Sequence, residues 1–273
     1  MEDQRRENIM ALAKLAYEVG RPKEALEYYV SAIKSGFETS PDVEVSGEER
    51  VLIAKVFKQN LVDLMTSVKE MDSLVRSKEF PKNERADSLL TEYRIDVVKD
   101  LVNTCLQIVQ LVSEILLPTA KETEAKVFYG KIAGDFSLYV AKVPRASWKG
   151  VNVSEFNVDS GIITAAQLKE YAVKKTENFY TMAHAEAQTQ LSPTHPVRLG
   201  LELNMSIFYY EMKRDIDLAI EFAKDAFDDA IAELDEEDQD QLSGENKKVA
   251  DILQLLKKNL KIWESKRKNA SKS

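Results

Sequence analysis

The sequence predicts an all-α fold, and three observations lead to this class. Only 9 Gly and 7 Pro occur among 273 residues, so few positions interrupt regular structure. Apolar residues recur along most of the chain at the three- and four-residue spacing of an amphipathic helix. Strand and helix patterns do not alternate, which argues against an α/β protein with a parallel sheet. We therefore expect a protein built from packed helices.

The first half of the chain contains five predicted helices with short breaks between them. Gly20 ends the first, Pro22 opens the second, and Pro118 and Pro144 end the fourth and fifth. The fourth is the most apolar, but polar side chains interrupt it, which favours a buried soluble helix over a membrane span. The predicted ranges are 4–19, 22–35, 52–77, 83–117 and 121–143.

The second half begins with the stretch of strongest loop character, residues 144–160. The letters VNVSEF in this stretch show a weak period of two, but its composition favours a long loop over a domain linker. Helical patterns then resume at 163–189, 194–212, 214–234 and 246–266. We expect one helical domain over residues 1–268 and a short basic tail at 269–273.

Charge and cysteine content limit the functional classes. A formal net charge of −8 disfavours general nucleic-acid binding, which needs a basic surface. Cys105 is the only cysteine, so an internal disulfide is impossible and a reducing compartment is favoured. The charged start MEDQRREN is unlike a signal peptide. We expect a protein of the cytoplasm, with the nucleus as a second compartment, and no membrane partner.

Residues that could carry catalysis are scarce. His184 and His195 lie outside any metal-ligand or nucleophile motif, and His195 in PTHP is placed to cap a helix. The acidic region 228–240 could bind a divalent cation, but solvated charges near a helix end explain it better. Cys105 is expected to be a small core residue. We predict no enzyme activity, no cofactor and no metal; a metal-dependent helical enzyme using region 228–240 is the least favoured alternative.

Two helices each carry one asparagine inside an otherwise apolar stripe. Taken singly, each side chain is best explained by hydrogen bonds to neighbouring core groups. Because the pattern occurs twice, it also fits a groove in which the amides bind the main chain of an extended peptide. The two stripes are Leu203, Asn204, Ile207 and Glu211, and Leu255, Asn259, Ile262 and Trp263.

These segments resemble the 14-3-3 family. The resemblance is carried by LSPTHPVRLGLELNMSIFYYE, FAKDAFDDAIAELD and LQLLKKNLKIWES, by KVFYGKIAGDFSLYVAKV, and more weakly by GEERVLIAKVFKQNLVDL. It implies a single bundle of about nine antiparallel helices. An amphipathic groove for phosphoserine or phosphothreonine peptides, with Asn204 and Asn259 contacting the peptide backbone, is also implied. The family consists of adaptors rather than enzymes, and the stretch 144–160 stands out as an insertion.

The phosphate pocket of the family is only partly present. Lys58 and Tyr139 match its pattern, and Lys131 is kept at the rim, but Met65 and Leu138 occupy the two positions where the family has arginine. Because arginine binds phosphate as a bidentate fork, we expect weakened selectivity for phosphorylated ligands. Acidic or apolar side chains should also be accepted at this position.

The resemblance implies a homodimer formed through the N-terminal helices. Arg21 can pair with Asp100 across the interface, but Glu24 would face Asp96, a pair of like charges. We therefore expect a dimer that is weaker than usual and tightens with salt. Its apolar contacts are expected from Leu15, Val19 and Tyr93.

The main alternative is a tetratricopeptide-type scaffold that binds unphosphorylated segments. Two helix–turn–helix units, at residues 13–33 and 204–231, resemble such repeats, although no regular 34-residue period connects them. The sequence leaves open the partner proteins, the preferred peptide motif and whether Ser147 in RASW is modified.

Overall fold

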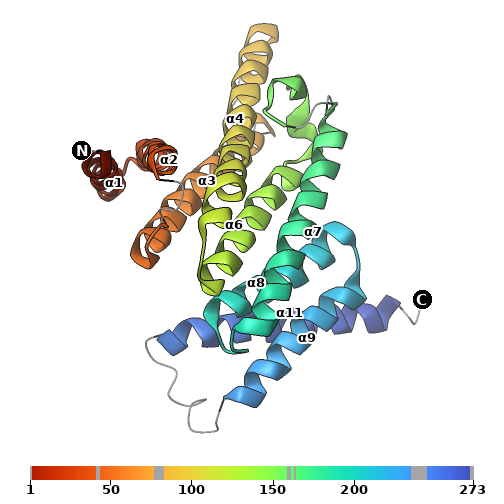
Figure 1. Cartoon of the computed structure of the whole chain (residues 1–273). Helices are drawn as coiled ribbons and strands as arrows, with labels where there is room; N and C mark the ends of the chain where they lie inside the picture. The colour runs from red at the N-terminus through yellow and green to blue at the C-terminus, as the bar shows by residue number, and fades with distance from the viewer. Residues whose placement is uncertain are drawn as a thin grey trace. The chain divides into compact units, whose positions relative to one another are not determined.

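The computed structural model describes residues 2–40, 44–76, 83–158, 161–162, 164–234 and 245–270 (Figure 1). In these ranges every regular element is helical, which confirms the all-α class, and nine helices are longer than ten residues, as expected. They are α1 (Glu2–Glu18), α2 (Pro22–Thr39), α3 (Gly47–Arg76), α4 (Glu84–Leu111), α6 (Thr123–Lys142), α7 (Ala165–Gln190), α8 (Pro196–Phe208), α9 (Ile216–Glu233) and α11 (Glu245–Ala270).

The helices form two compact units. Unit 1 comprises Met1–Lys121 and Ile132–Thr176, and unit 2 comprises Glu122–Lys131 and Glu177–Ser273. Helices α6 and α7 contribute residues to both units.

In unit 1, a tight turn joins α1 to α2. Gly20 adopts a left-handed φ of 78°, and the N–H of Arg21 donates to the carbonyl of Ala16 at 2.8 Å, which closes the first helix. Pro22 then starts α2, where its fixed φ suits the first helical turn. The Asn60 amide of α3 donates to the carbonyl of Pro22 at 2.8 Å and so fixes the start of α2 on α3. The predicted break at Gly20 and Pro22 is confirmed.

Helices α3 and α4 begin at side-chain caps and bury apolar faces. Ser46 and Glu49 exchange hydrogen bonds in a capping box at the start of α3. Cys105 is fully buried among apolar residues of α4, and burial raises the pKa of its thiol strongly, so it is a core residue as predicted. By length and composition alone, the run Glu84–Thr119 could also cross a membrane, a test that the core helix of a soluble protein passes too.

The segment 144–158 packs on α4 within unit 1. Its weak period-2 pattern does not produce a strand; it forms two short 3₁₀ turns, as the loop prediction allows. The Arg94 guanidinium donates to the carbonyls of Ala146 at 2.9 Å and Lys149 at 2.6 Å. Ser147 lies between them with no solvent exposure. A surface side chain of α4 therefore anchors the loop through its backbone.

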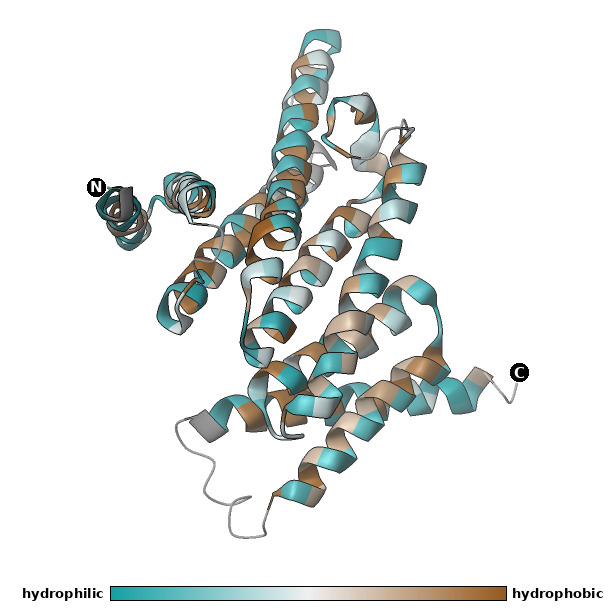
Figure 2. Ribbon diagram, in the orientation of Figure 1, coloured by the Kyte–Doolittle hydropathy of each residue, from teal (hydrophilic) through white to brown (hydrophobic). Residues whose placement is uncertain are grey.

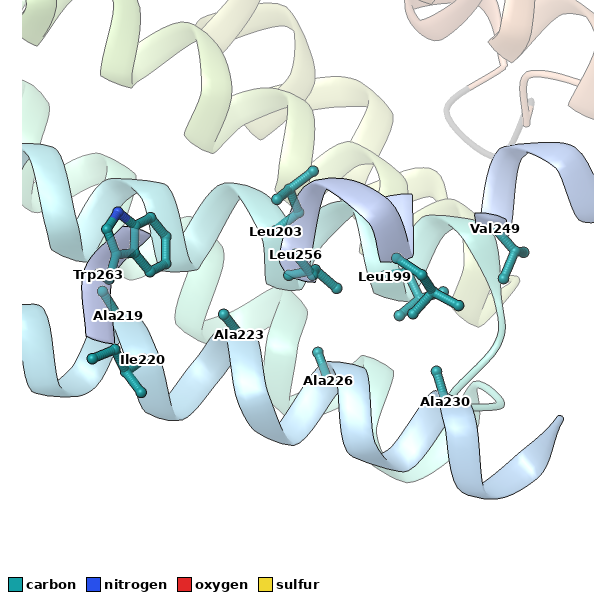
Figure 3. Close-up of a cluster of buried hydrophobic side chains, with 11 residues drawn as sticks. Leu199, Leu203, Ala219, Ile220, Ala223, Ala226, Ala230, Val249, Leu256 and Trp263 are labelled. Atoms are coloured by element: carbon teal, nitrogen blue, oxygen red, sulfur yellow. The ribbon is translucent and has the colours of Figure 1, made fainter. Parts of the chain in front are cut away.

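In unit 2, helices α8, α9 and α11 share one apolar core (Figure 3). Small residues of α9 at three- and four-residue spacing face this core, so the backbones of the neighbouring helices can come close. The cluster consists of Leu199, Leu203, Ala219, Ile220, Ala223, Ala226, Ala230, Val249, Leu253, Leu256 and Trp263. His195 caps α8, since its Nδ1 accepts from the Val197 N–H at 3.3 Å, and the capping prediction is confirmed.

Some of the sequence predictions concern residues outside the described ranges. They are the positions 235–240 of the acidic region 228–240, the end of the insertion at 159–160, and the tail residues 271–273. Within the described ranges, no group of three or more His, Cys, Asp or Glu side chains is arranged to hold a metal ion.

Candidate functional site

The first candidate stripe lies on α8 and the π-helical turn that follows it, Tyr209–Lys213. Asn204 and Ile207 are half-buried, and Glu211 is exposed. Asn204 also has an interaction partner within the described chain, so its amide serves the fold as well. Leu203 is only 8% exposed and belongs to the core of unit 2. Of this stripe, Asn204, Ile207 and Glu211 are accessible to a ligand.

The second candidate stripe lies on α11. Leu255 and Ile262 are 47% and 41% exposed, and their spacing of seven residues puts them on one face of the helix. The half-buried Asn259 lies between them and makes no side-chain hydrogen bond to any residue that the structure describes. Trp263 is 4% exposed and stacks on Tyr210, with ring centroids 5.0 Å apart, so it is mainly a core residue.

Together the two stripes give unit 2 the side-chain groups that can bind an extended peptide. A carboxamide can accept from a peptide N–H and donate to a peptide carbonyl. Exposed aliphatic side chains beside it cover apolar side chains of a ligand. Helices α8 and α11 pack against each other through the core in Figure 3, which holds the two stripes on one rigid support.

Four positions of the predicted phosphate pocket lie in unit 1: Lys58 and Met65 on α3, and Leu138 and Tyr139 on α6. An edge-to-face contact between Phe57 and Phe136, with centroids 6.0 Å apart, packs the two helices together. Lys58 is exposed, and Met65 is half-buried two turns further along the same face of α3. Leu138 is 6% exposed, so its side chain is part of the interior.

The Tyr139 hydroxyl is a hydrogen-bond donor at neutral pH. Burial raises its pKa above the ordinary value, and the negative charge of Asp135 one turn earlier raises it further. Of the four pocket positions on α3 and α6, the Lys58 ammonium and the Tyr139 hydroxyl can donate hydrogen bonds, whereas the side chains of Met65 and Leu138 have no donor.

Lys131, the predicted rim residue, belongs to unit 2. It is half-buried and lies over α8, because a Cβ placed on Gly200 would meet its Cε at 3.7 Å. This distance is an ordinary van der Waals contact, so the Lys131 stem packs along α8 at Gly200. The side chain has a partner within the described chain.

The sequence patterns did not indicate a buried ionisable pair behind α8. The Nδ1 atom of His184 on α7 lies 2.7 Å from a carboxylate oxygen of Glu202 on α8. Glu202 is 4% exposed, and the imidazole packs edge-to-face on Phe222 of α9. These contacts connect α8, the helix that carries Asn204, to α7 and α9. Its only sequence signal is a glutamate among the leucines of LGLELN.

The predicted dimer residues all lie in unit 1, Leu15 and Val19 on α1 and the turn after it, and Tyr93 on α4. Leu15, Val19 and Tyr93 are 54%, 60% and 61% exposed, which suits an apolar contact surface. Arg21 and Asp100 line a cavity of about 420 Å³ between the start of α2 and the middles of α3 and α4. In addition, Arg21 forms an ion pair with Glu24 of its own chain, an arrangement that the sequence did not predict.

Comparison with known proteins places these features in a family. The family model for 14-3-3 proteins matches residues 12–264. The chain belongs to the 14-3-3 family. It is 35% identical to 14-3-3 protein 10 of Solanum lycopersicum, over 97% of this chain and 94% of that protein. It is 36% identical to the 14-3-3 family protein artA of Aspergillus flavus (95% and 96%) and 34% identical to 14-3-3 protein zeta of Bombyx mori (95% and 92%).

Membership decides between the functional classes. The 14-3-3 proteins are dimeric adaptors that bind phosphorylated peptide segments of other proteins, and they are not enzymes. A tetratricopeptide-type scaffold is therefore set aside. With relatives about 35% identical, this chain is a divergent member.

Proposed function

We propose that this 14-3-3 protein is a cytoplasmic adaptor that binds extended peptide segments along the α8 and α11 stripes and selects weakly for phosphate. The half-buried amides of Asn204 and Asn259, next to the exposed Leu255 and Ile262, support the peptide-binding part. These groups recognise a backbone and its apolar side chains without requiring a phosphate.

The composition of the phosphate pocket supports the second part. A phosphate dianion that leaves water needs charge-assisted donors, and Met65 and Leu138 supply none. Each missing charged partner costs about 2–5 kcal/mol of binding free energy where the pair would be buried. Lys58 provides a point charge, which attracts phosphate with less geometric selection than an arginine. Acidic and apolar side chains then compete with phosphate at this position.

The test compares libraries of paired phosphorylated and unphosphorylated peptides on the full-length protein. We expect both members of many pairs to bind, with affinities that fall together when Asn259 is replaced by alanine. Binding confined to the phosphorylated members would contradict the second part of the proposal. Failure of both libraries to bind would contradict the first part.

The same family supports a homodimer, for which we propose a weaker contact than usual. The exposed Leu15, Val19 and Tyr93 offer the apolar area. The intrachain pair between Arg21 and Glu24 competes with an interchain pair to Asp100. Exposed ion pairs contribute only about 0–1 kcal/mol, so the apolar contacts have to carry most of the affinity.

A further inference from the structure

Helix α11 has a charge opposite to that of the rest of the chain. It contains eight Lys or Arg and three Asp or Glu, a net charge of +5, while the whole chain carries −8, which leaves −13 for the other residues. The basic residues of the last turn, Arg267 and Lys268, complement the helix dipole. Lys257, Lys258 and Lys261 lie in the middle of the helix, where the dipole gives no such benefit. In Figure 2 the C-terminal part of α11 is mostly hydrophilic.

Two of these cations share a face with the exposed aliphatic residues. At about 100° per residue, positions 255, 258, 259, 262 and 266 fall within an arc of about 100°. Lys258 and Lys266 are exposed, and Lys257 projects about 100° away from Lys258 on a different face. We call this set the α11 stripe: Leu255, Lys258, Asn259, Ile262 and Lys266.

The two lysines of the α11 stripe are held differently. The Lys266 ammonium lies 5.2 Å from the centre of the Tyr210 ring and 2.5 Å from its hydroxyl oxygen, and Tyr210 in turn stacks on Trp263. This contact orders the cation before a ligand arrives, which lowers the entropic cost of binding. Lys258 forms no ion pair with any residue that the structure describes. A carboxylate from outside would give it a partner.

The spacing of the stripe matches an extended peptide. Lys258, Ile262 and Lys266 are each four residues apart, which is about 6 Å along the helix axis. Alternate side chains on one face of an extended chain are about 6.6 Å apart. A segment of the pattern acidic–x–apolar–x–acidic would therefore place its two carboxylates at the lysines and its apolar side chain on Ile262.

We infer that the α11 stripe binds an unphosphorylated acidic segment of a partner protein, of the pattern acidic–x–apolar–x–acidic. The inference rests on the proposed function, because it names the ligand class for the same face. The competing explanation is that these lysines serve solubility, in which case Lys257 and Lys258 should behave alike.

The test uses full-length protein and two fluorescent peptides, one with Asp-x-Leu-x-Asp in a Gly/Ser background and a twin with Asn-x-Leu-x-Asn. We expect the acidic peptide to bind about fivefold more tightly at low salt, as two exposed ion pairs allow. This preference should shrink at high salt. Lys258→Gln should reduce it about threefold, while the control Lys257→Gln should leave it unchanged.

Each other outcome has a distinct meaning. If the twins bind equally well and Asn259→Ala weakens both, the inference is wrong and the proposed function stands. If neither peptide binds, the proposed function itself fails. Equal losses for Lys257→Gln and Lys258→Gln would show diffuse electrostatics and contradict the inference. Vesicles of anionic lipid that bind more tightly than the acidic peptide, and depend on Lys258, would assign the stripe to a membrane and contradict it as well.

Discussion

At the scale of single residues, Asn204 and Asn259 are not equivalent. The Asn259 side chain makes no hydrogen bond to any residue that the structure describes, whereas Asn204 has a partner there. Replacing Asn259 with alanine should weaken peptide binding by about 1–3 kcal/mol, because buried peptide groups lose their partner, and should leave the melting temperature unchanged. Asn204→Ala should lower both the affinity for the peptide and the melting temperature. Fluorescence anisotropy and thermal unfolding separate these effects, and a melting temperature that falls for Asn259→Ala without weaker binding would make it a core residue.

Tyr29 allows a prediction about alkaline stability. Its side chain is 1% exposed, and burial, with the charges of Glu49 and Glu18, raises its pKa to about 12. An unfolded tyrosine loses its proton near pH 10, so between pH 10 and 12 only the folded state keeps the proton. Stability is therefore complete below pH 10 and falls as the pH rises towards 12.

The matching substitution is Tyr29→Phe. Its hydroxyl has no hydrogen-bond partner among the described residues, so its removal should be neutral or stabilising at pH 8. Urea unfolding should be measured at pH 8 and at pH 11. Between these two pH values, the free energy of unfolding of the wild type should fall by about 1 kcal/mol more than that of the variant. Equal losses would show that Tyr29 does not cause the alkaline decline.

At the scale of helices, the pair His184–Glu202 joins α7 to α8. His184→Ala should destabilise the protein by about 2 kcal/mol or more, because it leaves a buried carboxylate without its partner. The double variant His184→Phe with Glu202→Ala replaces both side chains by apolar groups. It should lose less stability than the single variant His184→Ala. Chemical denaturation of the three proteins is the measurement. A double variant that is less stable than His184→Ala would contradict the unpartnered Glu202 carboxylate as the cause of the loss.

The positions of the helices could be predicted from the sequence because local rules determine them. Gly20 with Pro22, the His195 cap and the apolar periodicity act within one or two helical turns. The predicted ends agree with the structure to within a few residues for most helices. The structure extends three helices by four or five residues beyond the predicted ranges, at the end of α2 (Thr39), the start of α3 (Gly47) and the end of α11 (Ala270), where mostly polar residues leave little apolar pattern.

The site could be predicted only in part, because it depends on contacts between distant residues. Helical spacing put Leu203 and Trp263 on the stripes, but it does not determine whether a residue on a stripe faces the core or a ligand. The partner of Glu202 is 18 positions away in the sequence. Whether Arg21 pairs with Glu24 of its own chain depends on the conformation of the arginine side chain. Periodicity contains no information on such pairs.

At the scale of the whole molecule, dimerisation should depend on apolar contacts more than on charge. We predict a dimer that dissociates at micromolar concentration and tightens with salt, which screens the repulsion between Glu24 and Asp96. Replacing Val19, 60% exposed, with aspartate should produce monomers without lowering stability within one subunit. Analytical ultracentrifugation at two salt concentrations tests this. A tight dimer that is insensitive to salt would contradict the predicted weakness.

A substitution on α3 should restore phosphate selectivity. Met65 is half-buried on the same face as Lys58, so the stem of an arginine can lie along the helix and bring its guanidinium next to the lysine. Leu138 is 6% exposed, and an arginine there would bury a charge, so Leu138→Arg risks the fold. Met65→Arg is therefore the cleaner variant. It should raise the preference for phosphopeptides several-fold while leaving the unphosphorylated peptide unaffected.

The most direct test of weak phosphate selectivity is one ratio: the dissociation constant of an unphosphorylated peptide divided by that of its phosphoserine twin, measured on the wild-type protein at physiological salt. We predict a ratio below about ten, equivalent to about 1.4 kcal/mol. A wild-type ratio of about one hundred or more would show that Lys58, Tyr139 and their neighbours suffice for phosphate recognition, and would contradict the account.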